Sequence, residues 1–580
     1  MRGSGSYRRL ATAIIAVMAL SVCALAVTAA AKGSRSRQVS PAAAPVTVPR
    51  SLSVTIPSRN IVLPRMSCAA LARQDFSTIA GAPTSITSTS LVGRGAAQYC
   101  DVAGFIAPQT QFELRLPTHT YEDRYLQTGC GGNCGVVSIG LSPPGDIGVG
   151  LSSNTFAVAS DNEGHLATGR WDVWGAPGIS NPLRREFGYL ADHLTAVVAK
   201  KIITRFYGRR PAYSYFDGYS DGGRAAIQEA QRYPHDFNGI VAGAPAITIQ
   251  DALVSFDWAA RNLLSSSGGQ IIGPAALGVL HDAAVAACDR SNGTAVGQID
   301  DPRVCHWNPA QIRCTARRPK NCLTARQVAA AQAMYRGPRT RAGSYMYPGG
   351  EPYGSELAWP SFAEAGVFLA GSNLRFLAFA KDPPASYTWR DLRFTKRTWE
   401  ALQVMGAIYD ANNSNHPNLT SFAEAGGKLI VWQSWQDEAG GAFSVPDWYA
   451  QVAARYGGLA KAERFARVFM LPAGSHVQAA SGMIYDLQVL PNLINWVERG
   501  EVPTKIIAWQ SSPSGTVTRT YPVYPLPAVA EYSGQGSIDD EQSYKPYTPI
   551  GNLHFRWLGD PHAAPFPYRG WPFATRPHRS

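Results

Sequence analysis

The sequence has few charged residues and lacks the patterns by which proteins commonly bind nucleic acids or zinc. Asp, Glu, Lys and Arg make up 16% of its 580 residues, and no block of Lys and Arg and no basic helix is present. The formal net charge of +12 is therefore diffuse. This argues against a nucleic-acid partner and favours weak attraction of acidic substrates or anionic surfaces. The cysteine spacings match no zinc ribbon or finger, and no internal repeat is evident.

The composition that remains is that of a globular protein. Hydrophobic residues make up 45% of the chain, and its 14 Trp, 25 Tyr and 21 Phe suffice for aromatic-lined pockets. Because 580 residues exceed what one ordinary hydrophobic core holds, we expect two folded units with additional tails.

Residues 1–31 have the pattern of an export signal. Three arginines precede a long apolar run, and alanines at 29–31 form an A-x-A cleavage pattern. We therefore expect a secreted, extracellular protein with a linker over residues 32–60 and no membrane association after signal cleavage. The alternatives are an uncleaved membrane anchor, a lipid attached at Cys23, and export by the twin-arginine route.

Eight cysteines follow the signal, and an even number in an exported chain favours disulfides. Their clustering favours local pairing, although sequence alone does not prove it. The favoured pairs are Cys68–Cys100, Cys130–Cys134, Cys288–Cys305 and Cys314–Cys322.

Gly218-Tyr219-Ser220-Asp221-Gly222 is the only Gly-x-Ser-x-Gly pentapeptide in the chain. A β-prone run over 213–216 precedes it, and a helical stretch over 224–233 follows it. Strand, tight turn and helix are the context of a nucleophile elbow, in which glycines beside the serine tolerate the sharp turn. We predict that Ser220 is a catalytic nucleophile.

A serine nucleophile needs a base, and the base needs an acid that orients it. Asp437 and His476 follow predicted strands that end at residues 432 and 471, in the chain order Ser, Asp, His of α/β-hydrolases. We predict Asp437 as the acid and His476 as the base. Glu438 remains a competitor for the acid. His165 precedes the serine, and we expect it to be a structural, hydrogen-bonding residue near the pocket.

Acyl transfer also needs N–H donors for the developing oxyanion. We predict the backbone N–H of Asp221, directly after the nucleophile, as one donor. Gly131 is the predicted second donor because it lies in a glycine-rich segment, residues 129–135, that follows a predicted strand. A Cys130–Cys134 disulfide would stiffen this segment, and a plain glycine turn is the alternative.

The order of predicted elements indicates an α/β fold with a mostly parallel sheet. Strand-like and helical segments alternate over residues 61–250 and again over 425–535. Residues 251–424 between them carry four cysteines and long loops, which predicts a lid domain inserted into an α/β-hydrolase core. We expect residues 536–580 to form an irregular C-terminal tail.

From about Cys68 to Tyr544 these segments, in this order, resemble the tannase and feruloyl esterase family of α/β-hydrolases. The resemblance implies a secreted serine esterase that acts on small aromatic carboxylic esters, such as feruloyl or galloyl esters. It also implies a lid domain and the triad of Ser220, Asp437 and His476. The alternatives are another carboxylesterase, lipase or polyester hydrolase on the same scaffold, and a non-catalytic protein that binds phenolics or cell-wall polymers. Candidates for binding the acid are the lid aromatics Tyr345, Tyr347, Trp359, Phe362 and Trp389.

The chain departs from the family pattern at one pair of positions beside the triad. The family usually has a cysteine before the serine and another after the histidine, joined by a disulfide. Tyr219 and Val477 stand at these positions. We expect a packing contact between these two side chains to replace part of the lost bond.

A second departure concerns calcium, which many family members bind in the lid. By the resemblance, the matching positions are Asp289, Asn292, Thr294, Val296 and Gln298. Two usual aspartates are replaced by Asn292 and Val296, and calcium prefers carboxylate oxygens. We therefore expect no required cofactor and disfavour a structural calcium ion.

Overall fold

The computed structural model describes residues 52–137, 139, 154–166, 182–409, 417–439, 441–476, 484–512 and 514–560. The predicted export signal lies outside these residues. Within the described part, no helix combines the length and apolar character needed to span a bilayer.

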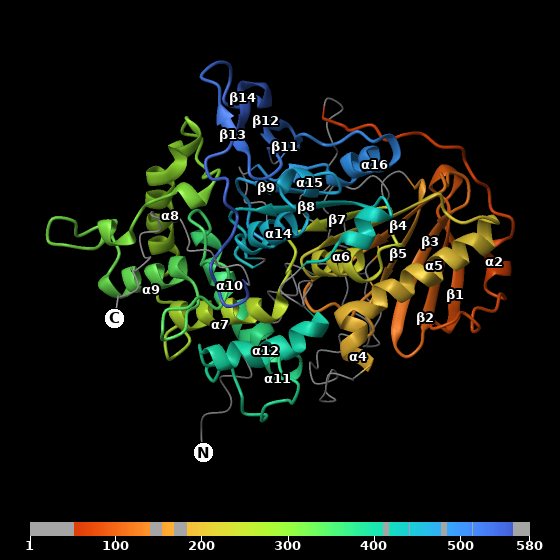
Figure 1. The fold of residues 1–580 in the computed structure, drawn as a ribbon, viewed down its shortest axis with the longest axis horizontal. Helices are drawn as coiled ribbons and strands as arrows, with labels where there is room; N and C mark the ends of the chain where they lie inside the picture. Colours follow the sequence, from red (N-terminus) through yellow and green to blue (C-terminus); the bar gives the residue numbers. More distant parts are fainter. Residues whose placement is uncertain are drawn as a thin grey trace, which may run out of the picture.

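Within the described residues, a nine-stranded mixed sheet runs from the middle of the molecule, at β9, to its right-hand edge in Figure 1, at β1, in the order β1-β2-β3-β5-β4-β6-β7-β8-β9. Its strands are β1 (Thr84–Val92), β2 (Tyr99–Ile106), β3 (Thr110–Pro117), β4 (Arg124–Thr128), β5 (Phe156–Asp161), β6 (Tyr213–Tyr219), β7 (Gly239–Gly243), β8 (Lys428–Ser434) and β9 (Ala466–Leu471). β1, β2, β3 and β5 pair antiparallel, and all pairs from β5 through β4 to β9 are parallel. This confirms the predicted α/β fold with a mostly parallel sheet.

Helices and two small antiparallel sheets surround the main sheet. The α-helices are α2 (Cys68–Leu71), α4 (Pro182–Arg185), α5 (Ala191–Tyr207), α6 (Asp221–Arg232), α7 (Ile249–Leu263), α8 (Pro274–Cys288), α9 (Ala325–Arg336), α10 (Trp359–Ala365), α11 (Gly371–Phe376), α12 (Lys396–Tyr409), α13 (Thr420–Glu424), α14 (Ser444–Arg455), α15 (Leu459–Ala462) and α16 (Val489–Arg499). The small sheets contain β10 (Asp486–Leu487), β11 (Ile506–Ser511) and β12 (Val517–Val523), and β13 (Val529–Tyr532) and β14 (Tyr544–Tyr547). Short 3₁₀ and π segments are η1 (Gly95–Ala97), η3 (Glu186–Leu190), η4 (Asp289–Asn292), η5 (Pro302–Val304), η6 (Pro309–Ile312), η7 (Glu356–Ala358), η8 (Gly366–Ala370) and η9 (Glu541–Ser543).

The two faces of the main sheet pack into separate hydrophobic clusters. Neighbouring residues of a strand point to opposite faces, so Tyr125 and Leu126 of β4 belong to different clusters. Residues of α5, α6 and α14 cover the first face, and residues of α16, β11 and β12 cover the second. The parallel strands are buried on both faces, and their carboxyl ends lie at one edge of the sheet. In open α/β sheets the active site usually lies at this edge.

The chain leaves the main sheet after β7 and returns to it at β8, and the helices α7 to α12 lie between these neighbouring strands in sequence. They form a group beside the sheet, drawn largely in green in Figure 1. Leu277, Trp359 and Phe362 pack in a separate hydrophobic cluster of this segment. The Nδ2 of Asn133, in the glycine-rich segment, donates to the Oδ1 of Asn373 in α11 at 3.1 Å. The inserted segment therefore contacts the loop that follows β4; its role as a lid stays a prediction.

The described part of the predicted C-terminal tail is irregular except for η9 and β14, and it packs against the rest of the protein. β14 pairs with β13, and Phe555 and Trp557 are buried. The backbone N–H of Phe555 and the indole N–H of Trp557 donate to the two carboxylate oxygens of Asp447 in α14, at 2.8 and 2.9 Å. Residues 548–560 form no helix or strand, as expected, whereas β14 and the docking of Phe555 and Trp557 onto α14 were not expected. Residues 561–580 lie outside the described residues.

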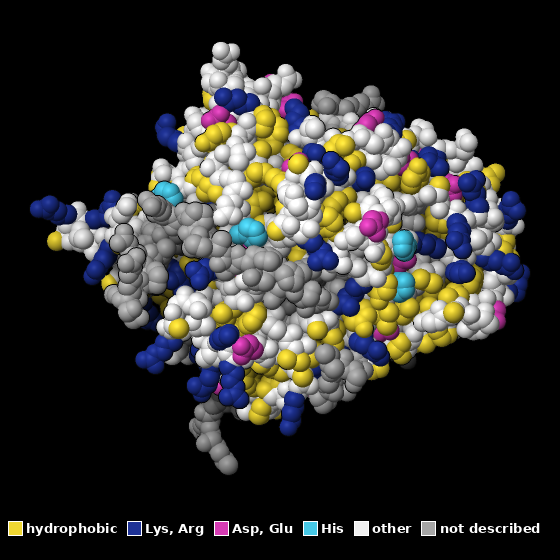
Figure 2. Space-filling model, in the orientation of Figure 1, with side chains coloured by type: hydrophobic (Ala, Val, Ile, Leu, Met, Phe, Trp, Pro, Cys, Tyr) yellow, Lys and Arg dark blue, Asp and Glu magenta, His cyan; other side chains and the backbone are white. Residues whose placement is uncertain are grey.

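The four cysteine pairs that clustering favoured are joined in the structure. Residues 52–60 of the predicted linker form no helix or strand, and the N–H of Val54 donates to the Oε1 of Gln488 at 2.8 Å. Lys and Arg side chains are scattered over the face shown in Figure 2, in agreement with a diffuse positive charge.

Candidate active site

Ser220 occupies the sharp turn between β6 and α6. Its backbone has φ 62° and ψ −117°, a conformation that a residue with a Cβ rarely adopts. Two hydrogen bonds hold this turn: the N–H of Ser220 donates to the carbonyl of Gly243 (2.9 Å), and its carbonyl accepts from the N–H of Arg224 (3.1 Å). A strained serine between a strand and a helix is the geometry of a nucleophile elbow.

The two glycines of the pentapeptide are required by close backbone approaches. A Cβ on Gly218 would lie 2.1 Å from the carbonyl oxygen of Gly222. A Cβ on Gly222 would lie 2.6 Å from the carbonyl oxygen of Cys130 in the neighbouring loop. The elbow therefore has room for glycine alone at both positions.

The structure brings the three predicted triad residues together. The Nε2 of His476 lies 2.7 Å from the Oγ of Ser220, and its Nδ1 lies 2.8 Å from the Oδ2 of Asp437. Each residue follows the carboxyl end of a parallel strand: β6, β8 or β9. Asp437 is 1% exposed and His476 8% exposed, while Ser220 is half-buried. This chain of hydrogen bonds is the arrangement that activates a serine hydroxyl.

Glu438, the competitor for the acid, contacts the backbone of His476 and not its imidazole. Its Oε2 accepts a hydrogen bond from the His476 N–H at 3.0 Å. Burial, with the charge of Asp437 adding to it, raises the pKa of Glu438 to about 7. Burial disfavours the imidazolium of His476, but the charge of Asp437, its hydrogen bond and the charge of Glu438 outweigh this and raise the pKa of His476.

The predicted oxyanion donors lie where two loops meet. The N–H of Gly222 donates to the carbonyl of Cys130 (2.8 Å), and the N–H of Gly129 donates to the carbonyl of Asp217 (3.0 Å). These bonds fasten the glycine-rich segment to the elbow. Asp221 is the first residue of α6. The space beside Gly131 is open, because a Cβ built on this glycine would meet no atom within 4 Å. Their roles as donors stay predictions.

His165 lies in the loop after β5 and is buried. Its Nδ1 is 3.1 Å from the carbonyl oxygen of Glu163, and its ring meets that of Phe187 edge-on, with centroids 5.7 Å apart. Burial lowers the pKa of His165. These contacts are those of the structural histidine that we expected.

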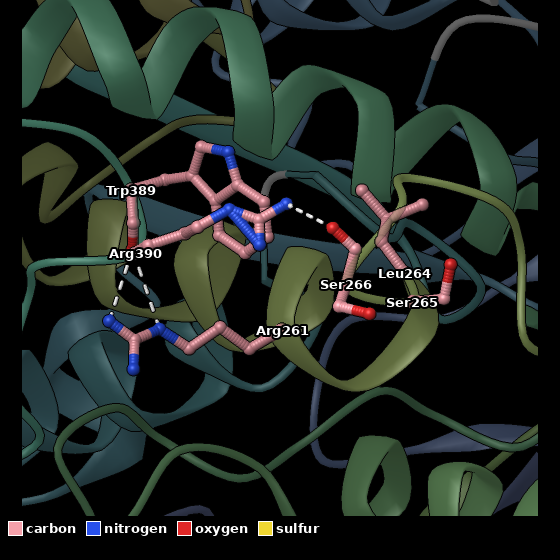
Figure 3. Close-up of a pocket in the computed structure, with 6 residues that line it drawn as sticks. All are labelled: Arg261, Leu264, Ser265, Ser266, Trp389 and Arg390. Atoms are coloured by element: carbon pink, nitrogen blue, oxygen red, sulfur yellow. Dashed lines mark hydrogen bonds between the residues drawn. The ribbon is translucent and has the colours of Figure 1, made fainter.

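A pocket of about 290 Å³ in the inserted segment contains none of the triad residues. Figure 3 shows the side chains that border it, with the guanidinium of Arg261 directed at the backbone of Trp389; the carbonyl of Trp389 accepts from Arg261 Nη2 at 3.2 Å. Its lining residues are Arg261, Leu264, Ser265, Ser266, Trp389 and Arg390. Of the aromatic candidates for binding the acid, Trp389 borders this separate pocket, and Trp359 and Phe362 lie in the core of the insertion.

The loop that matches the calcium site of the family does not fit a calcium ion. The two carboxylate oxygens of Asp289 accept hydrogen bonds from the N–H groups of Val296 (2.8 Å) and Gly297 (3.0 Å). The carbonyl of Val296 accepts from the guanidinium of Arg519 at 3.4 Å. Calcium requires about six to eight oxygen ligands that point at the ion. Here the carboxylate faces backbone donors, and a cationic side chain contacts one of the remaining oxygens.

Comparison with known proteins agrees with this geometry. Residues 92–546 match the family model described as tannase and feruloyl esterase. The chain is 30% identical to mono(2-hydroxyethyl) terephthalate hydrolase of Piscinibacter sakaiensis over 516 residues, which cover 77% of this chain and 84% of that protein. It is 27% identical to the probable feruloyl esterase B-2 of Aspergillus terreus, over 81% and 89% of the two chains. The crystal structure of feruloyl esterase B from Aspergillus oryzae superposes with a TM-score of 0.71 at 22% identity, covering 83% of this chain and all of that chain (100%), which establishes the α/β-hydrolase fold.

Proposed function

The chain belongs to the tannase and feruloyl esterase family of carboxylic ester hydrolases, and we propose that it cleaves esters of aromatic or phenolic acids through an acyl-enzyme. The observation that supports this proposal most directly is the unbroken series of hydrogen bonds from Ser220 through His476 to Asp437. A binding protein would have no need to hold a strained serine against a buried imidazole.

In the proposed mechanism, the Oγ of Ser220 attacks the ester carbonyl carbon while the Nε2 of His476 accepts its proton. Asp437 stabilises the imidazolium that forms and holds its orientation. The backbone N–H groups of Asp221 and Gly131 donate to the oxyanion of the tetrahedral intermediate. His476 then protonates the leaving alcohol and next deprotonates the water that releases the acid from Ser220.

We propose an aromatic acyl group because the names of two relatives specify esters of aromatic acids. Their names specify feruloyl esters and a terephthalate monoester, and both acids carry the carboxyl group on or near an aromatic ring. The same scaffold is consistent with an activity on terephthalate esters, so these belong in the same substrate test.

The test compares feruloyl, galloyl and terephthaloyl esters with aliphatic esters on the purified protein, beside a Ser220→Ala variant. We expect aromatic esters to give the higher kcat/KM, and Ser220→Ala to lose hydrolysis while its thermal unfolding stays unchanged. A serine-reactive phosphonate should label the wild-type protein at Ser220. Retained hydrolysis by Ser220→Ala, or absence of labelling, would contradict the esterase mechanism and favour a non-catalytic binder.

We also propose that the protein is exported. The pattern of residues 1–31 and the four disulfides of the structure support this, since disulfides persist in oxidising compartments. N-terminal sequencing of protein recovered outside the producing cell should begin shortly after residue 31, whereas an uncleaved anchor would leave the first residues in place.

A further inference from the structure

Tyr219, directly before the nucleophile, is hydrogen-bonded to the backbone of the proposed base. Its hydroxyl donates to the carbonyl oxygen of His476 at 2.6 Å. A second hydroxyl, that of Tyr485, lies 3.2 Å from the hydroxyl of Tyr219. The sequence led us to expect a packing contact with Val477, which lies outside the described residues. The contact that the structure shows is polar, and its partner is the histidine itself.

The aromatic ring of Tyr219 is fixed by its neighbours, so the hydroxyl has a defined position. The ring lies 5.1 Å from the imidazole of His476 and 5.4 Å from the indole of Trp432, measured between centroids. Burial, with the neighbouring hydroxyl and carboxylates adding to it, raises the pKa of Tyr219 well above its usual value. The hydroxyl therefore stays protonated and remains a hydrogen-bond donor.

The other polar backbone group of His476 is also held by a side chain. Its N–H donates to the carboxylate of Glu438, which is 3% exposed. Thus Tyr219, the last residue of β6, binds the carbonyl of His476, and Glu438, in the loop after β8, binds its N–H. His476 itself lies on the loop after β9, where no strand pairing fixes its backbone. The end of β6 and the loops after β8 and β9 are therefore connected through this one residue.

We propose that Tyr219 and Glu438 are positioning residues that hold His476 against Ser220 through its backbone. Their hydrogen bonds would take the place of the family disulfide between the positions of Tyr219 and Val477. The inference rests on the proposed function, because it explains how the proposed base, His476, is held in position. A proton acceptor displaced by about 1 Å costs about 100-fold in rate. Two hydrogen bonds to the backbone fix the position of the imidazole without touching either of its nitrogens, which are used for catalysis.

The first test is Tyr219→Phe, which removes the hydroxyl and keeps the ring. We expect kcat to fall about 10- to 100-fold with KM changed less than about twofold, because in the proposed role this bond orients the base and does not bind the substrate. The rate of phosphonate labelling at Ser220 should fall by a similar factor. Tyr207→Phe is the matched control: its hydroxyl donates to the carbonyl of Pro117 at 2.7 Å in a buried site on α5. It should lose stability but keep kcat and the labelling rate.

The second test uses Glu438 and remains valid if Tyr219→Phe folds poorly. Glu438→Gln keeps an oxygen acceptor for the His476 N–H, and Glu438→Leu removes it. On the alkaline plateau, Glu438→Gln should retain kcat, and Glu438→Leu should lose it about 10-fold or more without a matching change in KM.

Equal kcat values for Glu438→Gln and Glu438→Leu, or a wild-type labelling rate in Tyr219→Phe, would overturn the positioning role. Ser220→Ala separates this outcome from failure of the proposed function. If Ser220→Ala is inactive while Tyr219→Phe is unaffected, only the positioning role is wrong. If Ser220→Ala is active, the esterase mechanism itself is wrong.

Discussion

The guanidinium of Arg224 donates two hydrogen bonds to the carboxylate of Asp221, from Nε to Oδ1 at 2.7 Å and from Nη2 to Oδ2 at 2.9 Å. Arg224 is fully buried and also donates to the carbonyls of Phe187 (3.0 Å) and Gly188 (2.7 Å). Asp221 supplies the backbone N–H that we propose as an oxyanion donor. Arg224 therefore ties Asp221, in the first turn of α6 beside the nucleophile, to the backbone of Phe187 and Gly188.

Replacing Arg224 by Lys keeps the charge but loses the planar set of donors. We expect the free energy of unfolding to fall by about 1–3 kcal/mol because buried carbonyl and carboxylate oxygens lose partners, and kcat to fall with it. Denaturant unfolding and ester hydrolysis measure the two effects. Arg232→Lys, on the same helix but half-buried, is the control and should change neither strongly. Equal behaviour of the two variants would contradict this role of Arg224.

The acid of the triad is predicted to be Asp437 and not its neighbour. Asp437→Asn should lower kcat by about 10⁴-fold because the amide favours the wrong tautomer of His476. Glu438→Gln should have a far smaller effect on the alkaline plateau, since Glu438 contacts only the backbone N–H. Steady-state kinetics of the two variants on one ester decide the assignment, and the reverse order of effects would transfer the role to Glu438.

Glu438→Gln should also shift the pH dependence. His476 must be neutral to act as a base, so kcat/KM falls as the pH drops through its pKa, which lies above the ordinary value. Removing the negative charge of Glu438 destabilises the imidazolium and lowers that pKa. Because the pKa of Glu438 is about 7, its charge is present near and above neutral pH. The acid limb of kcat/KM should therefore move to lower pH; an unchanged limb, or a shift to higher pH, would contradict this.

The location of the triad could be predicted because it depends on local patterns. Short apolar strands that end at residues 432 and 471 and the glycines around Ser220 are visible in the sequence, and the carboxyl ends of parallel strands meet at one edge. The direction of each side chain could not be predicted. Asp437 and Glu438 are adjacent, and only the path of the loop decides which carboxylate reaches the imidazole.

The hydrogen bond of Tyr219 was not predictable for a different reason. Its acceptor is a backbone carbonyl, and every residue has one, so no residue type at the partner position reveals the contact. The buried aromatic residues near the C-terminus are a similar case. Phe555 and Trp557 dock onto α14, but the sequence around them has no helical or strand periodicity. They are stabilised by burial against a helix that is distant in sequence, which a local pattern does not reveal.

The Cys130–Cys134 disulfide is predicted to matter for catalysis more than for stability. It closes a short loop around Gly131, and in the chain-entropy view such a loop contributes only about 2 kcal/mol. A Cys130→Ala and Cys134→Ala double variant should lose kcat because the proposed oxyanion donor is less well held. The matched control replaces Cys314 and Cys322 by Ala, removing another short-range disulfide within the inserted segment. The control should lose similar stability and keep kcat; a wild-type kcat in both would contradict the prediction.

Calcium is predicted to be unnecessary for this protein. An ion that binds the folded state stabilises it by about 2.7 kcal/mol at 100 times its Kd, so a functional site would make the melting temperature depend on free calcium. In this chain Asp289 already accepts two backbone N–H groups, and Arg519 contacts the carbonyl of Val296. We therefore expect a chelator to leave both the melting temperature and activity unchanged. Arg519→Ala should lower the melting temperature by removing the contacts of its guanidinium. A rise in melting temperature on adding calcium to the wild type would show that the loop rearranges to bind the ion, and would contradict the prediction.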